Sequence, residues 1–495
     1  MDALVKQLMA VKAHHDEASR SAKGSHARAI DIRQVYAPPR SGPTLPAPPF
    51  LVFSVVEALM QSKYAERTKM IPGEADSFCA SEASNRQSTG AAAITIFTND
   101  SDMLIQATGT KIRVIMLNDL ENTATANGLP ANALIYRPSA IARSCGLAGL
   151  LEPAYFMSAD EHLTLQAAVE KAKRSTLRNT DQFHRFRLEY EHPTIYTAAQ
   201  AQTLEALHPL DSRVSELVHA SLVHSSRNAP GGLDMYLPVL IEDPSRACAW
   251  QLGADIRRLA YSMLLGSRPA GSQVDEHYRK GSIVGTTNLV TLEPCTVNEQ
   301  IAQWARYIEN LSSTTSKSTA IPRWRFIGLM SMLEMLQQDG KRLPTVSEIK
   351  NLATTWRRST WQELHLSAQY EAMLYSLRML KQLLVVRVAW TADNDKSEIL
   401  DLPAMQRLLA MLDTLPGISA LFDYDNHDEH EWPNLFAKLT EAFYIREDNA
   451  IANADLQPSK KRKRKRKKKL GESDSQEQAD PGSKRSTNPF ALLST

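Results

Sequence analysis

Cysteine is scarce in this chain of 495 residues, and its four cysteines form no CxxC pair: Cys79, Cys145, Cys248 and Cys295. A structural zinc site or a disulfide framework is therefore not expected, which suits a reducing compartment. The sequence also contains no G-x-G-x-x-G, P-loop, G-x-S-x-G or H-E-x-x-H motif. A nucleotide-dependent enzyme, a serine hydrolase or a zinc protease of these types thus has no support.

Long hydrophobic runs are missing as well. The longest apolar stretch, Leu383–Trp390, is short and contains Arg387. A membrane-spanning helix needs about 20 consecutive apolar residues, so no membrane association is expected. The N-terminus shows no charged segment followed by an apolar one, and hence no signal-peptide pattern.

What the chain does contain is an ordinary globular composition, with 43% hydrophobic and 23% charged residues. Its length predicts two or three domains with tails. Six prolines within residues 37–49 indicate a linker, and the polar residues beyond 449 indicate disorder. The expected divisions are an N-terminal helix (1–36), a proline-rich linker (37–49), an α/β domain (50–190), a mostly helical extension (191–300), a helical region (301–449) and a disordered basic tail (450–495).

An α/β pattern occupies the first third of the chain. Residues 93–97 and 111–117 are rich in β-forming residues, and a helical pattern precedes them at 75–84. This alternation predicts a parallel sheet. Residues 68–71 are expected to end a further strand, and Ser282–Val290 has a β-like pattern. From about residue 322 onward the apolar spacing is helical, and Thr345 with Glu348 forms a capping-box signature.

Two acidic clusters lie where a parallel sheet would place a site. Glu74 and Asp76 open the expected helix, and Asp100 and Asp102 follow the first strand. Ligands of open α/β sheets bind at the carboxyl ends of the strands. Carboxylates suit Mg²⁺ or Mn²⁺, and two such ions about 4 Å apart assist phosphodiester hydrolysis. A purely structural interpretation is also open, because acids favour helix starts and turns.

The two clusters carry a family resemblance. Residues 72–80, P-G-E-A-D-S-F-C-A, and residues 98–104, T-N-D-S-D-M-L, resemble the XPG/flap-endonuclease (PIN-like) superfamily, and most closely its fungal asteroid-like branch. Further likeness lies at 136–147 and 237–262, so that it covers roughly residues 50–300. The resemblance implies a partial PIN-like parallel-sheet domain followed by a mostly α-helical region. It also implies Mg²⁺ or Mn²⁺ ligands that activate water: Glu74, Asp76, Asp100 and Asp102.

The chain departs from the family at its N-terminal end. Members carry further acidic ligands there, whereas Asp2, Asp16 and Asp31 are the only aspartates before the linker and none follows an apolar β-run. We therefore expect either a shortened, weakened protein or a sequence that begins partway through a longer one. Two functions stay open: a metal-dependent, structure-specific nuclease on DNA or RNA, and a non-catalytic nuclear scaffold or nucleic-acid-associated regulator. A shortened sheet would expose an edge that invites a partner.

A basic run near the C-terminus predicts nuclear localisation through the import machinery, or loose contacts with DNA or RNA phosphates. It comprises Lys460, Lys461, Arg462, Lys463, Arg464, Lys465, Arg466, Lys467, Lys468 and Lys469. The apolar ending at 488–493 and the helical region are candidate surfaces for protein partners. His427 and His430 are expected in a polar loop rather than at a metal, because their spacing matches no known site.

Overall fold

The structure is a computed structural model that describes residues 1–21, 46–70, 75–107, 109–122, 131–160, 162–174, 180–190, 210–227, 232–266, 272–315, 318–354, 358, 360–394, 400–423 and 431–444. Most of the proline-rich segment, Glu74, His427, His430 and the basic run at 460–469 lie outside these ranges. The chain divides into two compact units. Unit 1 comprises Met1–Lys69 and Ala206–Thr495, and unit 2 comprises Met70–Glu205.

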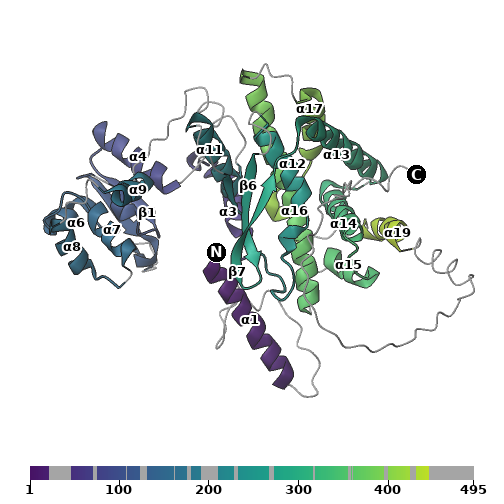
Figure 1. Cartoon of the computed structure of the whole chain (residues 1–495), viewed down its shortest axis with the longest axis horizontal. Coiled ribbons are helices and arrows are strands. Elements are labelled where there is room, and N and C mark those ends of the chain that lie inside the picture. The colour runs from purple at the N-terminus through teal and green to yellow at the C-terminus, as the bar shows by residue number, and fades with distance from the viewer. Residues whose placement is uncertain are drawn as a thin grey trace, which may run out of the picture. The chain divides into compact units, whose positions relative to one another are not determined.

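Unit 2 is built on a parallel strand pair (Figure 1). β1 (Ile94–Thr98) pairs with β2 (Ile112–Met116), with Ile94 opposite Ile112 and Thr98 opposite Met116. β-Branched side chains fit this pleated, half-buried surface. The helix α4 (Ala75–Ser88) packs on β1 through the small side chains of Ala80 and Ala83. The predicted helix–strand–strand order and the parallel pairing are therefore confirmed.

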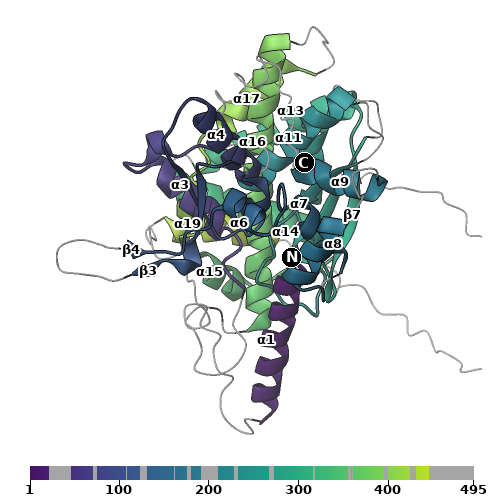
Figure 2. The same ribbon diagram turned by 90° about the vertical axis from the view of Figure 1, so that its left-hand side faces the viewer.

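The remaining elements of unit 2 complete this small α/β fold. They are α5 (Met103–Gln106), β3 (Glu121–Asn122), β4 (Ala131–Asn132), α6 (Pro138–Ser144), α7 (Leu151–Ala159), α8 (Leu165–Arg174) and α9 (Asp181–Tyr190), with η2 (Leu117–Asp119). β3 and β4 pair antiparallel, as Figure 2 shows. The Tyr155 ring of α7 meets the rings of Phe183 and Phe186 of α9 edge-on, at centroid distances of 5.3 and 5.4 Å. Residues 68–70 form no strand, so the expected strand end there is wrong over the described part.

Unit 1 is organised around the 34-residue helix α16 (Trp361–Asn394), most of whose described side chains are buried. The elements of this unit are α1 (Asp2–Ser21), α3 (Leu51–Met60), η1 (Ala65–Arg67), α11 (Ser212–Arg227), η4 (Ala249–Gln251), α12 (Ala254–Leu264), α13 (Pro294–Thr314), α14 (Ala320–Gln338), α15 (Val346–Thr354), α17 (Leu402–Leu412), α18 (Ile418–Leu421) and α19 (Trp432–Phe443). α12, α14 and α17 pack against α16 (Figure 1). The predicted helical C-terminal region is thus confirmed.

Local signals define several helix ends in unit 1. Thr345 and Glu348 form the expected capping box: the Glu348 carboxylate accepts from the Thr345 N–H at 2.7 Å, and the Thr345 hydroxyl accepts from the Glu348 N–H at 3.2 Å. Gly340 follows α14 with φ of 64°, a left-handed conformation that glycine adopts without strain. Among the described helices, none is both long and apolar enough to cross a membrane.

Unit 1 also contains a three-stranded mixed sheet, β5 (Leu233–Tyr236), β6 (Gln273–Lys280) and β7 (Ile283–Val290). β5 runs parallel to β6, and β7 returns antiparallel to β6 after a turn at Gly281, where φ is 63°. The carboxylate of Asp2, at the start of α1, accepts from the Val284 N–H at 3.1 Å. Only the third of these strands carries the β-like pattern seen in the sequence.

Candidate functional site

Asp100 and Asp102 lie at the carboxyl edge of the β1–β2 pair, directly after β1. The Thr98 hydroxyl accepts from the Asp100 N–H at 2.9 Å, and Asp100 Oδ1 accepts from the Asp102 N–H at 2.9 Å. These bonds form a tight turn of the type that aspartate stabilises. Both side chains are exposed, so the turn presents two carboxylates to solvent at the position that the sequence predicts.

A tyrosine from a distant helix completes the surroundings of Asp102. The Tyr190 hydroxyl, in the last turn of α9, donates to Asp102 Oδ2 at 3.2 Å, across 88 positions of sequence. The other carboxylate oxygens, Asp100 Oδ2 and Asp102 Oδ1, accept no hydrogen bond from the residues that the structure describes. Each aspartate therefore keeps one oxygen with which it can bind a cation.

The end of β2 adds polar groups to the same edge. Asn99 Oδ1 accepts from the Asn118 N–H at 2.9 Å and so ties the segment after β1 to the segment after β2. Asp119 Oδ2 accepts from the Tyr136 hydroxyl at 3.0 Å. This hydrogen bond raises the pKa of Tyr136, because it stabilises the protonated phenol. The sequence analysis missed Asp119, although it follows β2 much as Asp100 follows β1.

The first turn of α4 carries Asp76. At the other end of this helix, Gln87 Oε1 accepts from the Lys111 N–H at 3.0 Å, just before β2 begins. Since the last turn of α4 lies at the amino edge of the sheet, its first turn lies toward the carboxyl edge. α4 also packs on α5, the short helix that follows Asp102. Partial burial and the nearby negative charge of Asp76 raise the pKa of the Cys79 thiol, which keeps that thiol protonated.

The structure therefore brings together only part of the four predicted carboxylates. Asp100 and Asp102 share one turn, Asp76 lies on the helix whose first turn faces their edge, and Glu74 lies outside the described residues. Within the described ranges, no three His, Cys, Asp or Glu side chains lie close enough together to hold a metal ion. The four-carboxylate site stays a prediction, because one of its members is not described.

Comparison with protein families gives a match over this region. Residues 47–291 match the family model described as "XPG domain containing". The chain belongs to the XPG-domain family. The matched residues include the acidic clusters of unit 2 and also the sheet and α12 of unit 1. No curated protein and no solved structure matched the chain.

The part of the XPG domain in unit 1 holds two buried ion pairs. Arg257 donates through Nε and Nη2 to the two carboxylate oxygens of Glu276 at 2.6 and 2.8 Å, and Tyr261 donates to the same carboxylate at 2.8 Å. Arg279 Nε donates to Glu242 Oε1 at 2.8 Å. All four ionised side chains are at most 2% exposed. Buried charges require this kind of paired, fully hydrogen-bonded arrangement.

The Arg279–Glu242 pair also holds the backbone of the E-D-P-S-R-A stretch, residues 242–247. Glu242 Oε2 accepts from the Ala249 N–H at 2.6 Å, and Arg279 donates to the carbonyl oxygens of Pro244, Gly281 and Arg246. The motif therefore fixes the path of an irregular segment of unit 1. Both of its acidic residues, Glu242 and Asp243, are engaged in structure, in contrast to the open carboxylate oxygens after β1.

Proposed function

We propose that this XPG-domain protein is a divalent-metal-dependent nuclease that hydrolyses phosphodiester bonds in structured DNA or RNA. Within the family, we assign it to the asteroid-like branch on the motifs at 72–80 and 98–104. The observation that carries the proposal is the pair of exposed carboxylates, Asp100 and Asp102, at the carboxyl edge of a parallel strand pair in an XPG domain. Glu74 and Asp76 are the proposed partners of that pair.

The donor chemistry fits Mg²⁺ or Mn²⁺. Both ions prefer oxygen ligands, and the turn after β1 offers two carboxylates that each keep an oxygen open within the described residues. When bound, the ions supply an activated water and neutralise charge on the phosphate. In this chain, the Thr98 hydroxyl holds the Asp100 backbone, the Asp102 N–H orients the Asp100 carboxylate, and the Tyr190 hydroxyl orients that of Asp102.

The basic run at 460–469 supports a nuclear location for the proposed nuclease. Ten consecutive lysines and arginines match the composition that nuclear import receptors bind, and they also attract nucleic-acid phosphates. Phosphate contacts of this kind weaken steeply as salt rises and read no base sequence. We therefore assign substrate choice to the folded units and the salt-sensitive attraction to the basic run.

The direct test is cleavage of labelled flap DNA and structured RNA in Mn²⁺. We expect the full chain to cleave one of these substrates, and an Asp100→Asn/Asp102→Asn variant to lose cleavage by at least about a hundredfold, because amides bind divalent cations far less well than carboxylates. Asp160→Asn/Asp181→Asn is the matched control: both residues are exposed aspartates of unit 2 that do not belong to the turn after β1. Equal cleavage by the parent and the Asp100/Asp102 variant would refute the site.

A second function, a non-catalytic nuclear scaffold or regulator, is favoured by one observation. Unit 2 exposes several large apolar side chains, on α4, on β1 and in the segments that follow β2 and β4: Phe78, Phe97, Leu117, Leu134 and Ile135. Exposed apolar groups of this size are typical of surfaces that bind partners. If a folded parent chain cleaves neither substrate in Mg²⁺ or Mn²⁺, the scaffold replaces the nuclease as the conclusion.

A further inference from the structure

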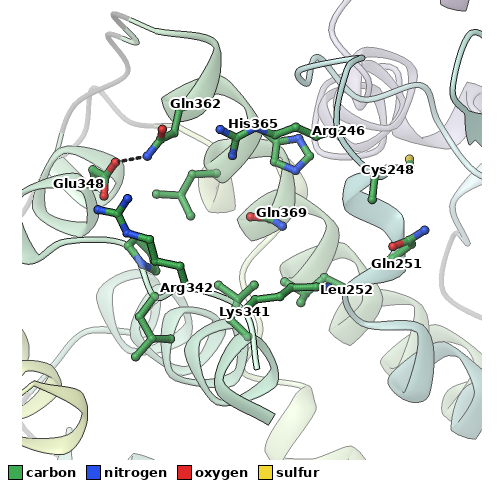
Figure 3. A pocket seen from close by; sticks show the side chains of 15 residues that line it. Arg246, Cys248, Gln251, Leu252, Lys341, Arg342, Glu348, Gln362, His365 and Gln369 are labelled. Atoms are coloured by element: carbon green, nitrogen blue, oxygen red, sulfur yellow. Dashed lines mark hydrogen bonds between the residues drawn. The ribbon is translucent and has the colours of Figure 1, made fainter. Parts of the chain in front are cut away.

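Unit 1 contains a cavity of about 340 Å³ that belongs to none of the acidic clusters. Its wall is formed by residues 246–252, by the segment between α14 and α15, and by the first turns of α15 and α16 (Figure 3). The volume lies within the range of small-ligand sites, about 300 to 1,000 Å³. The cavity is lined by both polar and apolar side chains, so a ligand can form hydrogen bonds and apolar contacts in it.

Positive charge predominates in the lining. Arg246, Lys341 and Arg342 contribute three cations, and Figure 3 shows Arg246 beside His365, with Lys341 and Arg342 on another wall. Two of them also pair with carboxylates outside the lining: Arg246 lies 3.5 Å from Asp243, and Lys341 lies 2.8 Å from Asp339. Glu348 is the one carboxylate of the lining. Its Oε2 accepts from the Thr345 N–H at 2.7 Å, which caps α15, and its Oε1 accepts from the Gln362 amide of α16 at 2.6 Å, so both oxygens are already engaged. The lining itself therefore holds more cations than carboxylates, which favours an anion over a cation as its ligand.

His365 is a buried polar group of this cavity whose Nδ1 has no hydrogen-bond partner among the described residues. The side chain is 6% exposed, and Nδ1 lies 3.5 Å from Glu242 Oε2. Burial first, and then the positive charges of Arg246, Arg279 and Lys341, lower the pKa of His365 to about 4, whereas Asp243 opposes the shift. The imidazole is thus neutral at pH 7, and an unpaired buried polar atom calls for an explanation.

We propose that this cavity binds the phosphate group of a nucleotide. Arg246, Lys341 and Arg342 would contact the phosphate oxygens, because guanidinium and ammonium groups form strong charge-assisted hydrogen bonds with phosphate. The side-chain amides of Gln251 and Gln369, which also line the cavity, offer the paired donors and acceptors that base edges require.

The phosphate has two possible sources that share this chemistry, a free mononucleotide and the phosphorylated end of a nucleic-acid strand. Neither source depends on the acidic clusters, so the inference goes beyond the proposed nuclease. An Asp100→Asn/Asp102→Asn chain should accordingly bind the nucleotide as the parent does, whatever happens to cleavage. Failure of one proposal is therefore distinguishable from failure of the other.

The test is calorimetric titration of the full chain with AMP, with inorganic phosphate, and with a short oligonucleotide carrying either a 5′-phosphate or a 5′-hydroxyl. Lys341→Gln/Arg342→Gln removes two cations on exposed residues, so this variant should fold, as circular dichroism can verify. We expect it to bind AMP at least about tenfold more weakly, because two charge-assisted contacts are lost. Arg306→Gln/Arg407→Gln removes the same charge from the exposed surfaces of α13 and α17 and should bind AMP unchanged.

The outcomes separate the two sources of the phosphate and also test the proposal itself. Tighter binding of the 5′-phosphorylated strand than of the 5′-hydroxyl strand would identify a nucleic-acid end as the ligand, and AMP binding without such a difference would identify a free nucleotide. The basic run meets both oligonucleotides alike, so the difference between the 5′-phosphate and the 5′-hydroxyl isolates the cavity. The proposal is overturned if AMP does not bind the parent, if AMP binds no better than inorganic phosphate, or if the Lys341/Arg342 variant retains full affinity.

Discussion

Replacing Glu334 by glutamine should stabilise unit 1 increasingly as the pH rises. Glu334 lies on α14, is 7% exposed, and shares a hydrogen bond with Tyr307 of α13. Burial raises the pKa of Glu334 from 4.5 to about 8, and the Tyr307 hydroxyl, which stabilises the carboxylate, offsets only part of the effect. The folded protein therefore holds a proton on Glu334 that the unfolded chain has already released at pH 7.

The sign follows from proton linkage. Below pH 4.5 both states are protonated and the residue has no effect on the pH dependence. Between pH 4.5 and 8 the unfolded state loses its proton first, so the free energy of unfolding falls as pH rises, and above pH 8 the loss is complete. The full displacement corresponds to about 5 kcal/mol. Glutamine cannot ionise, so the stability gained by Glu334→Gln should grow over this window and then level off.

Urea unfolding followed by tryptophan fluorescence at pH 5, 7 and 9 measures this gain. All seven tryptophans fall in residues 206–495, so the signal reports on unit 1. We expect the variant-minus-parent difference to increase by about 3 to 5 kcal/mol from pH 5 to pH 9. Glu299→Gln removes an exposed glutamate from α13 and serves as the control. A difference that stays constant between pH 5 and pH 9 would refute the assignment of a buried, protonated Glu334.

Three further predictions concern unit 1 and use the same urea assay at pH 7. Gly328→Ala should lower the free energy of unfolding by about 1 to 3 kcal/mol, because the added Cβ would lie 2.5 Å from a Leu374 methyl group in a packed core; an unchanged midpoint would show that this packing is loose. Arg257→Met should lower it by about 3 to 5 kcal/mol, since the Glu276 carboxylate is left buried without a counter-charge, and the double change with Glu276→Met should recover part of that loss. Thr345→Ala removes the cap of α15 and should lower it by about 1 kcal/mol, whereas Thr345→Ser should retain most of the stability.

Local patterns in the sequence were sufficient to predict the centre of unit 2. Segments rich in β-forming residues predicted β1 and β2, the helical spacing between 75 and 84 predicted α4, and their order predicted parallel pairing. The same order placed Asp100 and Asp102 at the carboxyl edge, because a residue that follows a strand lies at that edge by geometry alone. Capping of α15 was likewise a local feature, carried by two residues three positions apart.

The features that the sequence did not predict depend on distant partners. β6 contains several charged residues and lacks an apolar alternation, because Glu276 and Arg279 occupy buried positions where a strand normally carries apolar side chains. Their neutralising partners, Arg257 and Glu242, lie 19 and 37 residues earlier. The Tyr190 bond to Asp102 spans 88 positions, and no periodic pattern marks such a pair. The positive cavity likewise draws its cations from two separate segments.

Unit 1 is interrupted in sequence by unit 2, and this fixes the order in which the chain can fold as it is made. α3 leaves the ribosome early, but it packs against α18 and, through Phe50 and Phe53, against Tyr375 of α16. About 300 residues separate α3 from α16, which corresponds to roughly 15 to 60 s of synthesis. During that interval residues 70–205 emerge as an uninterrupted segment with its own core, whereas α3 is held without its partners. The nascent chain therefore presents an apolar helix and a finished α/β unit together, long before unit 1 can close.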